Sequence, residues 1–357
     1  MEKVETKQSN QRVVWVDWCR AFAICCVLLC HTTERVYWLI LPGFGEYPLI
    51  RQVFSLTMFT IGRLGVPVFF MISGYLLLDR AYDYERSKRF YRNNLLGLVL
   101  TTEIWIVIYN LFNVYFYGYN LDFEVLIRNM LFVKNTEMTH MWYMPVIIGL
   151  YMFIPFAANA LQHTDGRILR KIIAFAFIWL FIIPEINVIL YAEQEEALSA
   201  LIDLSYSGGC YGVYIATGYF WKKGYFDKIP TFVFPIAFLV CFPVTVWVQL
   251  FSFQKGVGYG LWYNNATLFI AAFSIFAFMA RQRSIKDISA IRVLAFCSFG
   301  LYLIHNPVNM MLSQYFNIES CTLRLAIIFT LTLVISWVGV YILSRSKRIG
   351  RILFFMK

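Results

Sequence analysis

A row of ionisable side chains follows one face of the first strongly apolar segment, residues 13–41. Arg20 and His31 are eleven residues apart. Eleven residues are about three helical turns, so a helix would hold both side chains on one face, roughly 16 Å apart along its axis. The same arc, roughly 100° wide, also holds Asp17, Glu34 and Arg35. Histidine can accept a proton from a hydroxyl group, and arginine can bind a phosphate or a carbonyl oxygen. Ionisable groups on an apolar membrane helix therefore predict a functional site.

A purely structural interpretation explains part of this row. Asp17 and Arg20 are three residues apart and could simply form an ion pair on the surface of the helix. That pair would give no reason for His31, which would then be a structural histidine inside the protein.

The second apolar stretch contains small residues together with a proline. Small residues such as Ser73 allow neighbouring helices to approach closely, and Pro67 removes a backbone donor and is expected to kink its helix. Taken alone, this pattern is typical of helix packing. Arg63, one helical turn before Pro67, is the exception, because an arginine inside a membrane requires an anionic or carbonyl partner.

Two further polar groups lie at the ends of apolar stretches. Arg89 and Arg92 are three residues apart, a pair suited to binding phosphate. Basic residues also gather at such a position simply because the loop is cytoplasmic. At 139–145, where the chain is expected to re-enter the membrane from outside, Trp142 and Tyr143 are typical of an interfacial anchor.

A late apolar stretch also carries a polar face. One face of this helix, roughly 60° wide, would hold Ser298, Tyr302, His305 and Asn309. The charges of the loops place His305 in the outer half of the membrane, at a depth similar to that of His31, so the two histidines are expected to line one cavity. Two further acids within apolar stretches, Glu103 and Glu185, have no assigned partner.

These residues would be positioned by a bundle of membrane helices. The 357 residues are 60% hydrophobic and only 15% charged, with a mean hydropathy of +0.62, unlike a soluble domain. Apolar blocks recur, each long enough to cross a bilayer. They predict an all-α integral membrane protein, a single polytopic domain over 1–357 with a leader at 1–12 and a basic tail at 345–357. About ten transmembrane helices are expected, near 13–35, 55–78, 93–116, 141–160, 170–191, 206–221, 231–251, 261–280, 291–312 and 323–344.

The charges of the loops predict how the chain is oriented. The formal net charge is +10, and most Lys and Arg residues fall in alternate loops and in the two terminal segments. The opposite loops are poorer in basic residues and richer in acids. The positive-inside rule therefore places both termini in the cytoplasm. The same clustering explains the positive charge without a nucleic-acid partner.

The longest loop on the predicted outer side covers residues 117–139. Within it, residues 121–132 show apolar residues at helical spacing. We therefore expect a short helix that lies along the outer membrane interface.

The cysteines and the common catalytic motifs argue against several other functions. The eight cysteines lie mostly inside apolar stretches, and their spacing fits neither a zinc template nor a disulfide framework. They are expected to be small buried hydrophobic residues, and no metal is predicted. The sequence shows no phosphate-binding glycine loop and no serine nucleophile elbow. A cleavable signal peptide is not expected either.

Five blocks of the sequence together resemble the acyltransferase family 3 membrane proteins. In chain order they are Trp15–Ala23 followed by His31, Val66–Tyr75, Arg89–Arg92, Met141–Tyr143 with Tyr151–Pro155, and Ser298–His305. Each block is weak alone, but five blocks in the right order over most of the chain are specific. The chain looks most similar to the short bacterial members that O-acetylate cell-envelope glycans, such as the acetyltransferase of the enterobacterial common antigen.

The resemblance implies a membrane O-acyltransferase of the bacterial inner membrane. Acetyl-CoA would be the donor, and an envelope glycan or glycolipid would be the acceptor. The donor would bind from the cytoplasm with its phosphates near Arg89 and Arg92. Arg20 would guide the pantetheine or the thioester, and His31 would act as base on the acceptor hydroxyl or carry the acyl group itself. The catalytic group implied in this way is His31, Arg20 and Asp17. The implied supporting residues are Arg63, Glu34, Tyr302, His305, Ser73, Trp142 and Tyr143.

Two other functions remain open from the residues alone. Buried Arg and His also suit a transporter or flippase for a lipid-linked or small anionic substrate. A membrane protein that binds acyl-CoA as a regulator, without any acceptor, would need only the basic pair. Consumption of acyl-CoA separates both alternatives from an acyltransferase.

Overall fold

The protein is helical throughout the part of the chain that the structure describes. This computed structural model describes residues 12–39, 44–134, 136, 138–199, 201–257, 262–282 and 284–356. No strand occurs among these residues. The helices are α1 (Val14–Tyr37), α2 (Leu49–Arg63), α3 (Gly65–Leu77), α4 (Tyr84–Phe90), η2 (Tyr91–Leu95), α5 (Leu96–Tyr117), α6 (Phe123–Met130), η3 (Thr139–Trp142), α7 (Tyr143–His163), α8 (Gly166–Phe177), η4 (Ile178–Ile182), α9 (Ile183–Ala192), α10 (Gly209–Lys222), α11 (Val233–Gln254), α12 (Ala266–Arg281), α13 (Ser289–Tyr315), α14 (Cys321–Ser344) and α15 (Lys347–Phe354).

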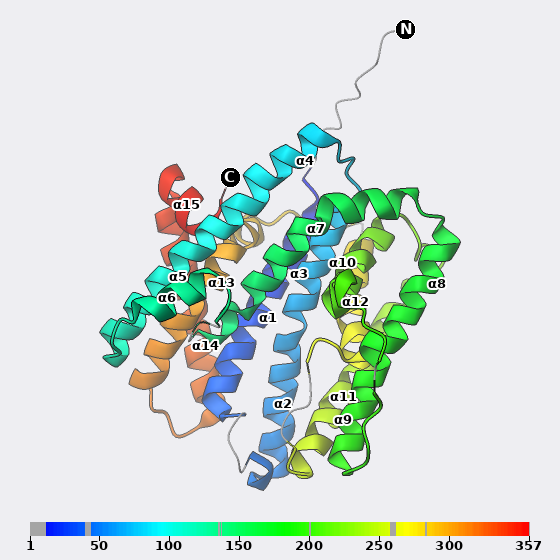
Figure 1. Ribbon diagram of the computed structural model, residues 1–357. Helices are drawn as coiled ribbons and strands as arrows, with labels where there is room; N and C mark the ends of the chain where they lie inside the picture. Colours follow the sequence, from blue (N-terminus) through cyan, green and yellow to red (C-terminus); the bar gives the residue numbers. More distant parts are fainter. Residues whose placement is uncertain are drawn as a thin grey trace.

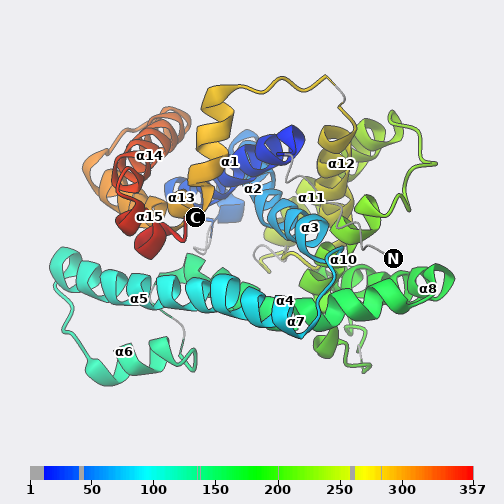
Figure 2. The ribbon, with the colours of Figure 1, turned by 90° about the horizontal axis from the view of Figure 1, so that it is seen from above.

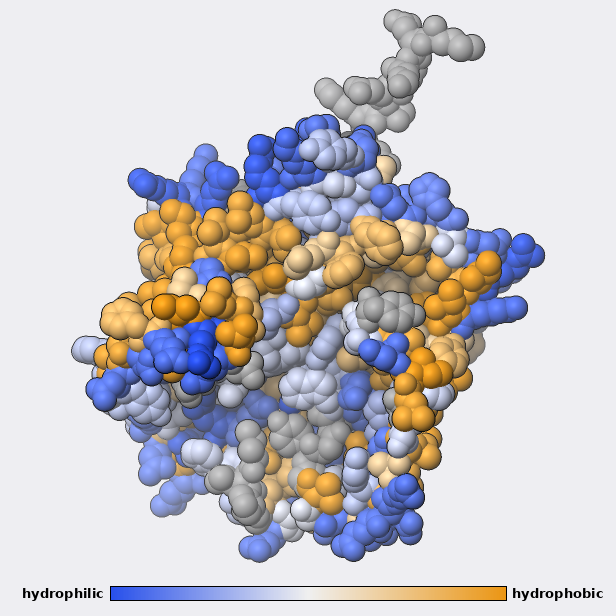
Figure 3. All heavy atoms as spheres, viewed as in Figure 1, coloured by the Kyte–Doolittle hydropathy of each residue, from blue (hydrophilic) through white to orange (hydrophobic). Residues whose placement is uncertain are grey.

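The prediction of an all-α membrane protein is confirmed. Eight helical segments of the described chain are long and apolar enough to cross a membrane, namely 14–37, 49–77, 84–117, 139–163, 166–192, 233–254, 289–315 and 321–344. The two other predicted spans correspond to shorter helices, α10 with 14 residues and α12 with 16. Each of the ten predicted stretches therefore contains a helix. Figure 3 shows hydrophobic side chains mainly across the middle of the surface and hydrophilic ones toward its two ends.

The short helix α10 can be short because it packs inside the bundle against α3. The two backbones touch: a Cβ on Gly218 would lie 1.9 Å from the carbonyl oxygen of Met71, and a Cβ on Gly74 would lie 1.8 Å from that of Ile215. The expectation that small residues allow close approach is confirmed here. Just beyond α10, Lys223 donates to Asp79 at 2.9 Å, and this hydrogen bond raises the pKa of Lys223.

The second membrane segment is broken where the proline was expected to kink it. Helix α2 ends at Arg63, and α3 begins at Gly65. Pro67 has no N–H to bond to the carbonyl of Arg63, which favours an interruption one turn earlier. The break leaves Arg63 at the end of a helix, where its side chain can turn toward neighbouring elements.

Helix α1 forms the centre of the bundle. It packs against α2, α3, α12, α13 and α14, and the polar row identified in the sequence therefore lies inside the protein. Seen from above in Figure 2, α4, α5, α7 and α8 form a layer along one side of this central group. The predicted helix at 121–132 is present as α6, which stands outside that layer beside α5 (Figure 2).

The first and last described helices begin and end on the same side of the molecule. Figure 1 shows the start of α1 and the C-terminal helix α15 at the same end of the bundle. This arrangement agrees with an even number of crossings. That this side faces the cytoplasm stays a prediction.

Candidate active site

Two cavities lie along the polar row of α1, one toward each of its ends. We call the cavity near the start of α1 the inner cavity and the one near its end the outer cavity. The inner cavity has a volume of about 470 Å³ and is lined at its polar positions by Arg20, Ser73, Arg80, Asn94, Tyr143, Tyr151, Ser298 and Tyr302. The outer cavity has a volume of about 390 Å³, and its polar and aromatic lining comprises His31, Glu34, Arg63, Asn129, Lys134, Trp142, Trp262 and Tyr263. Most of the residues singled out in the sequence thus line a cavity.

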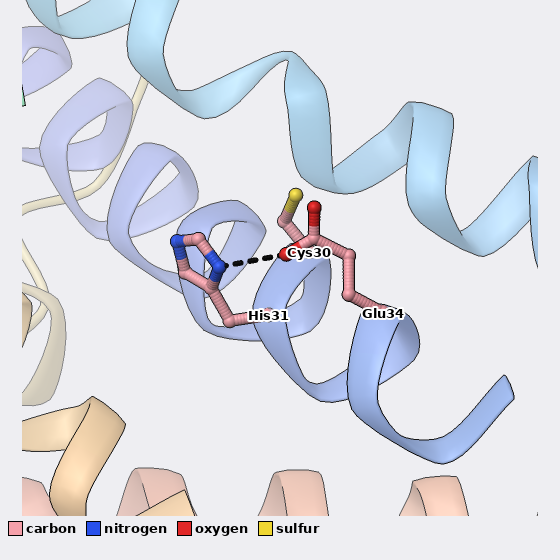
Figure 4. Close-up of side chains that lie close together, drawn as sticks. All are labelled: Cys30, His31 and Glu34. Atoms are coloured by element: carbon pink, nitrogen blue, oxygen red, sulfur yellow. Dashed lines mark hydrogen bonds and ion pairs between the residues drawn. The ribbon is translucent and has the colours of Figure 1, made fainter. Parts of the chain in front are cut away.

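A histidine and a carboxylate form the centre of the outer cavity. His31 Nδ1 lies 2.9 Å from Glu34 Oε2 (Figure 4). An ionised carboxylate can only accept, so Nδ1 carries the proton and His31 Nε2 keeps its lone pair. Because residues three apart on a helix are neighbours, the geometry of α1 alone brings His31 and Glu34 together. The arrangement leaves His31 able to accept a proton on the nitrogen opposite the carboxylate.

Arg63 completes this group from the neighbouring helix α2. Its guanidinium lies 3.6 Å from Glu34 Oε1, and the residue is only 3% exposed. The rings of Phe59 and Trp262 each lie 4.7 Å from it. Gly62 permits this approach, because a Cβ there would lie 2.5 Å from the Cα of Cys30. The intramembrane arginine therefore has the anionic partner that its position required.

Aromatic side chains form one wall of the outer cavity. The rings of Trp142 and Trp262 lie 5.0 Å apart, and those of Trp142 and Tyr263 are stacked at 5.4 Å. Beside this wall, Glu185 Oε2 accepts from the backbone N–H of Thr267 at 3.1 Å in the first turn of α12. Glu185, left without a partner in the sequence, thus caps the helix that begins beside the aromatic wall.

Three histidines from distant parts of the chain meet behind the cavity wall. The His31 and His305 rings are stacked with their centroids 5.4 Å apart, and the His140 ring lies 5.3 Å from His305 and 6.1 Å from His31. His305 was expected to share a cavity with His31. The structure places the two side by side, but His305 is fully buried and packs behind His31 rather than on the cavity wall.

His140 is fixed by a chain of hydrogen bonds that the sequence did not reveal. Its Nδ1 lies 2.8 Å from the Asn306 amide nitrogen, and its Nε2 lies 3.1 Å from the Tyr109 hydroxyl. The amide nitrogen must donate, so Nδ1 accepts and Nε2 donates. The Asn306 amide oxygen accepts in turn from Arg35 of α1 at 3.2 Å. The sequence signals were only that His140 lies in the stretch 139–145 and that Asn306 directly follows His305.

The inner cavity carries two arginines. Neither Arg20 nor Arg80 has an acidic partner among the described residues, and the Arg80 side chain donates to the carbonyl of Leu76 at 2.7 Å. Arg80 was not singled out from the sequence. Toward the outer cavity, the Tyr302 hydroxyl donates to the carbonyl of His140 at 2.8 Å. Tyr302 lines only the inner cavity, so it belongs to the layer between the two.

Asp17 lies away from both cavities. Its carboxylate accepts from Arg12 Nε at 2.6 Å, and Arg12 also pairs with Asp287 at 3.0 Å. The Asp17–Arg20 pair considered as a structural explanation of the row is therefore replaced by a pair with Arg12. Arg12 thus links Asp17 at the start of α1 to Asp287 in the loop before α13.

Arg89 and Arg92 are exposed and do not line the inner cavity. Phe90 is buried and Asn94 lines the cavity, and these two positions, four residues apart, share one helical face. Arg89 and Arg92 must then face away from it. The structure brings Arg80 to the cavity in their place.

A possible metal-ligand set at the outer cavity is unfavourable for a cation. The ligand atoms of Cys30, His31 and Glu34 all lie within 4.8 Å of one another (Figure 4). The guanidinium of Arg63 next to Glu34 would repel a metal ion, and the existing bond from His31 would have to break. These residues fit the ion-paired arrangement better than a metal site.

Two comparisons relate the chain to known proteins. A family model described as an acyltransferase domain matches residues 13–341. A curated relative from Enterococcus faecalis, named amino-acid racemase, is 28% identical over 144 residues. That match covers 39% of this chain and 19% of the relative, so the chain spans only a small part of that protein. No solved structure matches the chain.

Proposed function

Because the chain belongs to the acyltransferase family whose domain model matches residues 13–341, we propose that it moves an acetyl group across the membrane. The donor is cytoplasmic acetyl-CoA, and the acceptor is a hydroxyl group of an envelope glycan or glycolipid at the bacterial inner membrane. The observation that supports this most is that α1 carries a histidine–carboxylate dyad at one cavity and Arg20 at the other, where Arg80 from the segment after α3 also lines the wall.

The donor occupies the inner cavity in this proposal. Arg20 and Arg80 bind its phosphate groups, because a guanidinium without an acidic partner is free to form bidentate bonds to phosphate. Arg89 and Arg92, exposed on the adjoining segment, attract the anionic donor from solution. The apolar remainder of the cavity accommodates the pantetheine arm with the thioester toward Tyr143 and the outer cavity.

The acceptor occupies the outer cavity, with sugar rings against the aromatic wall. His31 Nε2 takes the proton of the acceptor hydroxyl, and Glu34 stabilises the imidazolium that forms. The acceptor oxygen bonds to the acetyl carbon and the carbon–sulfur bond breaks. The thiolate of CoA then takes the proton from His31, so the products are an acetyl ester and free CoA.

This proposal can be tested with purified protein in lipid. Labelled acetyl-CoA and an envelope glycan extract are supplied to the unaltered chain and to the Arg20→Ala, Arg80→Ala and His31→Ala variants. We expect label on the glycan from the unaltered chain only, with His31→Ala slowed roughly 100- to 10,000-fold. Arg170→Ala, an exposed arginine on α8 away from both cavities, is the matched control and should behave like the unaltered chain.

Three outcomes would contradict all or part of the proposal. If acetyl-CoA is neither bound nor consumed, the donor assignment is wrong and a transporter or flippase becomes the better explanation. If transfer occurs and His31→Ala retains it, the dyad is not the base. Greater loss of donor affinity in Arg89→Ala than in Arg80→Ala would move the phosphate site to the exposed pair.

A further inference from the structure

The C-terminal helix α15 has two very different faces. Gly350 and Phe354 are buried against the bundle. The opposite face exposes Lys347, Arg348 and Arg351 together with two isoleucines, Ile349 at 38% and Ile352 at 44%. An eight-residue helix with one basic, half-apolar face turned outward is the pattern of a segment that lies in a membrane surface.

The inner face of α15 is seated in one defined position. Thr101 and Trp105 of α5 donate to its last carbonyl groups, those of Ile352 at 3.2 Å and Leu353 at 2.7 Å. Carbonyls at the end of a helix have no partner within it, so these side chains satisfy them. Gly97 makes room for the turn that follows, because a Cβ there would lie 2.4 Å from the Phe355 ring.

The end of α15 forms part of the wall of the inner cavity. Phe354, Phe355 and Met356 line the same cavity as Arg20 and Arg80. A displacement of α15 would therefore remove part of the apolar wall of the cavity that we assign to the donor. The shape of the inner cavity therefore depends on the position of α15.

The outer face carries positive charge that nothing in the described chain neutralises. Lys347, Arg348 and Arg351 form no ion pair with a described residue, and no acidic residue occurs between Cys321 and the end of the sequence. Helix α14, a membrane-length segment, ends only two residues before α15. Basic residues directly after a membrane helix lie at the depth of the lipid headgroups.

We propose that α15 binds anionic phospholipid headgroups through Lys347, Arg348 and Arg351, and that this contact holds the wall of the inner cavity in place. The exposed isoleucines enter the boundary between headgroups and acyl chains beside the basic residues. The lipid contact stands independently of the reaction, whereas its effect on donor binding rests on the proposed function.

Amide hydrogen exchange of α15 tests the lipid contact. The full chain is placed in vesicles of phosphatidylcholine alone or with about 30% phosphatidylglycerol. Each basic residue near an anionic surface favours the bound state roughly fivefold, so exchange in residues 347–354 should slow by about tenfold or more in the anionic vesicles. High salt should reverse the slowing, because the charges are exposed.

Two triple variants separate this contact from a general effect of charge. The first variant carries Lys347→Gln, Arg348→Gln and Arg351→Gln. Its α15 amide hydrogens should exchange equally fast in both kinds of vesicle. The second variant carries Arg167→Gln, Arg170→Gln and Lys171→Gln, which remove the same charge from three exposed positions of α8. It should keep the slow exchange of α15 in the anionic vesicles. Equal exchange of the unaltered chain in both lipids would overturn the proposal, and so would protection that survives in the α15 variant.

Donor affinity tests the second half of the proposal. Acetyl-CoA should bind the unaltered chain several-fold more tightly in the anionic vesicles, and the α15 variant should lose this difference. If exchange responds to lipid but donor affinity does not, the coupling to the cavity is refuted. If acetyl-CoA binds in neither lipid, the proposed function fails while the lipid contact is still decided by the exchange measurement.

Discussion

At the scale of single residues, the carboxylate of Glu34 determines which ring nitrogen of His31 can accept a proton. It accepts the Nδ1 proton of His31 at 2.9 Å and lies 3.6 Å from Arg63. The arginine helps to hold the carboxylate in place, and the carboxylate leaves the lone pair of His31 on Nε2. The three side chains come from two helices and act as one unit.

Glu34→Gln should lower the rate of acyl transfer by roughly 100-fold or more, since an amide cannot stabilise the imidazolium that forms during transfer. Donor affinity should remain unchanged, because Glu34 lines only the outer cavity. Single-turnover kinetics with a separate donor titration would measure both effects. Glu124→Gln, which alters an exposed ion pair on α6, is the control. A loss of donor affinity equal to the loss of rate would contradict this assignment.

His140 should matter for stability at least as much as for transfer. His140→Ala would leave the buried amide nitrogen of Asn306 without its acceptor, at a cost of about 1–3 kcal/mol. The Tyr109 hydroxyl, by contrast, would keep its bond to the carbonyl of Leu303. We expect a clear fall in the thermal unfolding temperature of the purified protein. His163→Ala, an exposed histidine at the end of α7, should leave it unchanged. An unaltered unfolding temperature in His140→Ala would show that the network is not structural.

At the scale of elements, the packing of α3 on α10 fixes one wall of the inner cavity. Gly218→Ala would force the two helices apart, because the new Cβ would lie 1.9 Å from the Met71 carbonyl oxygen. Overpacking of this kind typically costs about 1–3 kcal/mol. The loss should appear in denaturant or thermal unfolding and as weaker donor binding, since Ser73 of α3 lines the cavity.

Gly149 on α7 offers a matched control for that substitution. No atom lies within 4 Å of a Cβ placed there, so Gly149→Ala should be neutral or stabilise α7 by up to about 1 kcal/mol. If both substitutions had the same effect on unfolding, the close backbone contact between α3 and α10 would not limit the packing.

Local helix geometry explains which parts of this architecture could be predicted from the sequence. The spacing of His31 and Glu34 on one helix already brings them together, and the apolar stretches locate the helices. His140 and Tyr109, by contrast, meet only because η3 and α5 pack together, and Arg80 reaches the inner cavity only because α3 ends there. Glu185 likewise contacts Thr267 of α12 only because the two residues, distant in the sequence, come together in the folded protein. Contacts between distant helices leave no periodic signal in a single sequence.

At the scale of the whole molecule, the ends of the described chain lie on one side of the bundle (Figure 1). Loop charge predicts that this side is cytoplasmic. A fluorescent protein that matures only in the cytoplasm should therefore fluoresce when fused after residue 357. The same protein fused to a chain truncated after Tyr119, on the predicted outer side, should remain dark. The opposite pattern would invert the orientation and exchange the donor and acceptor cavities.

The layer of side chains between the two cavities has a consequence for the cell's energy supply. No described residue lines both cavities, and buried rings such as those of Tyr302 and His305 occupy the space between them. A continuous column of water through the protein would offer ions a path across a membrane that stores an electrical potential. If the proposed transfer takes place, this layer would act as electrical insulation between the donor and acceptor cavities.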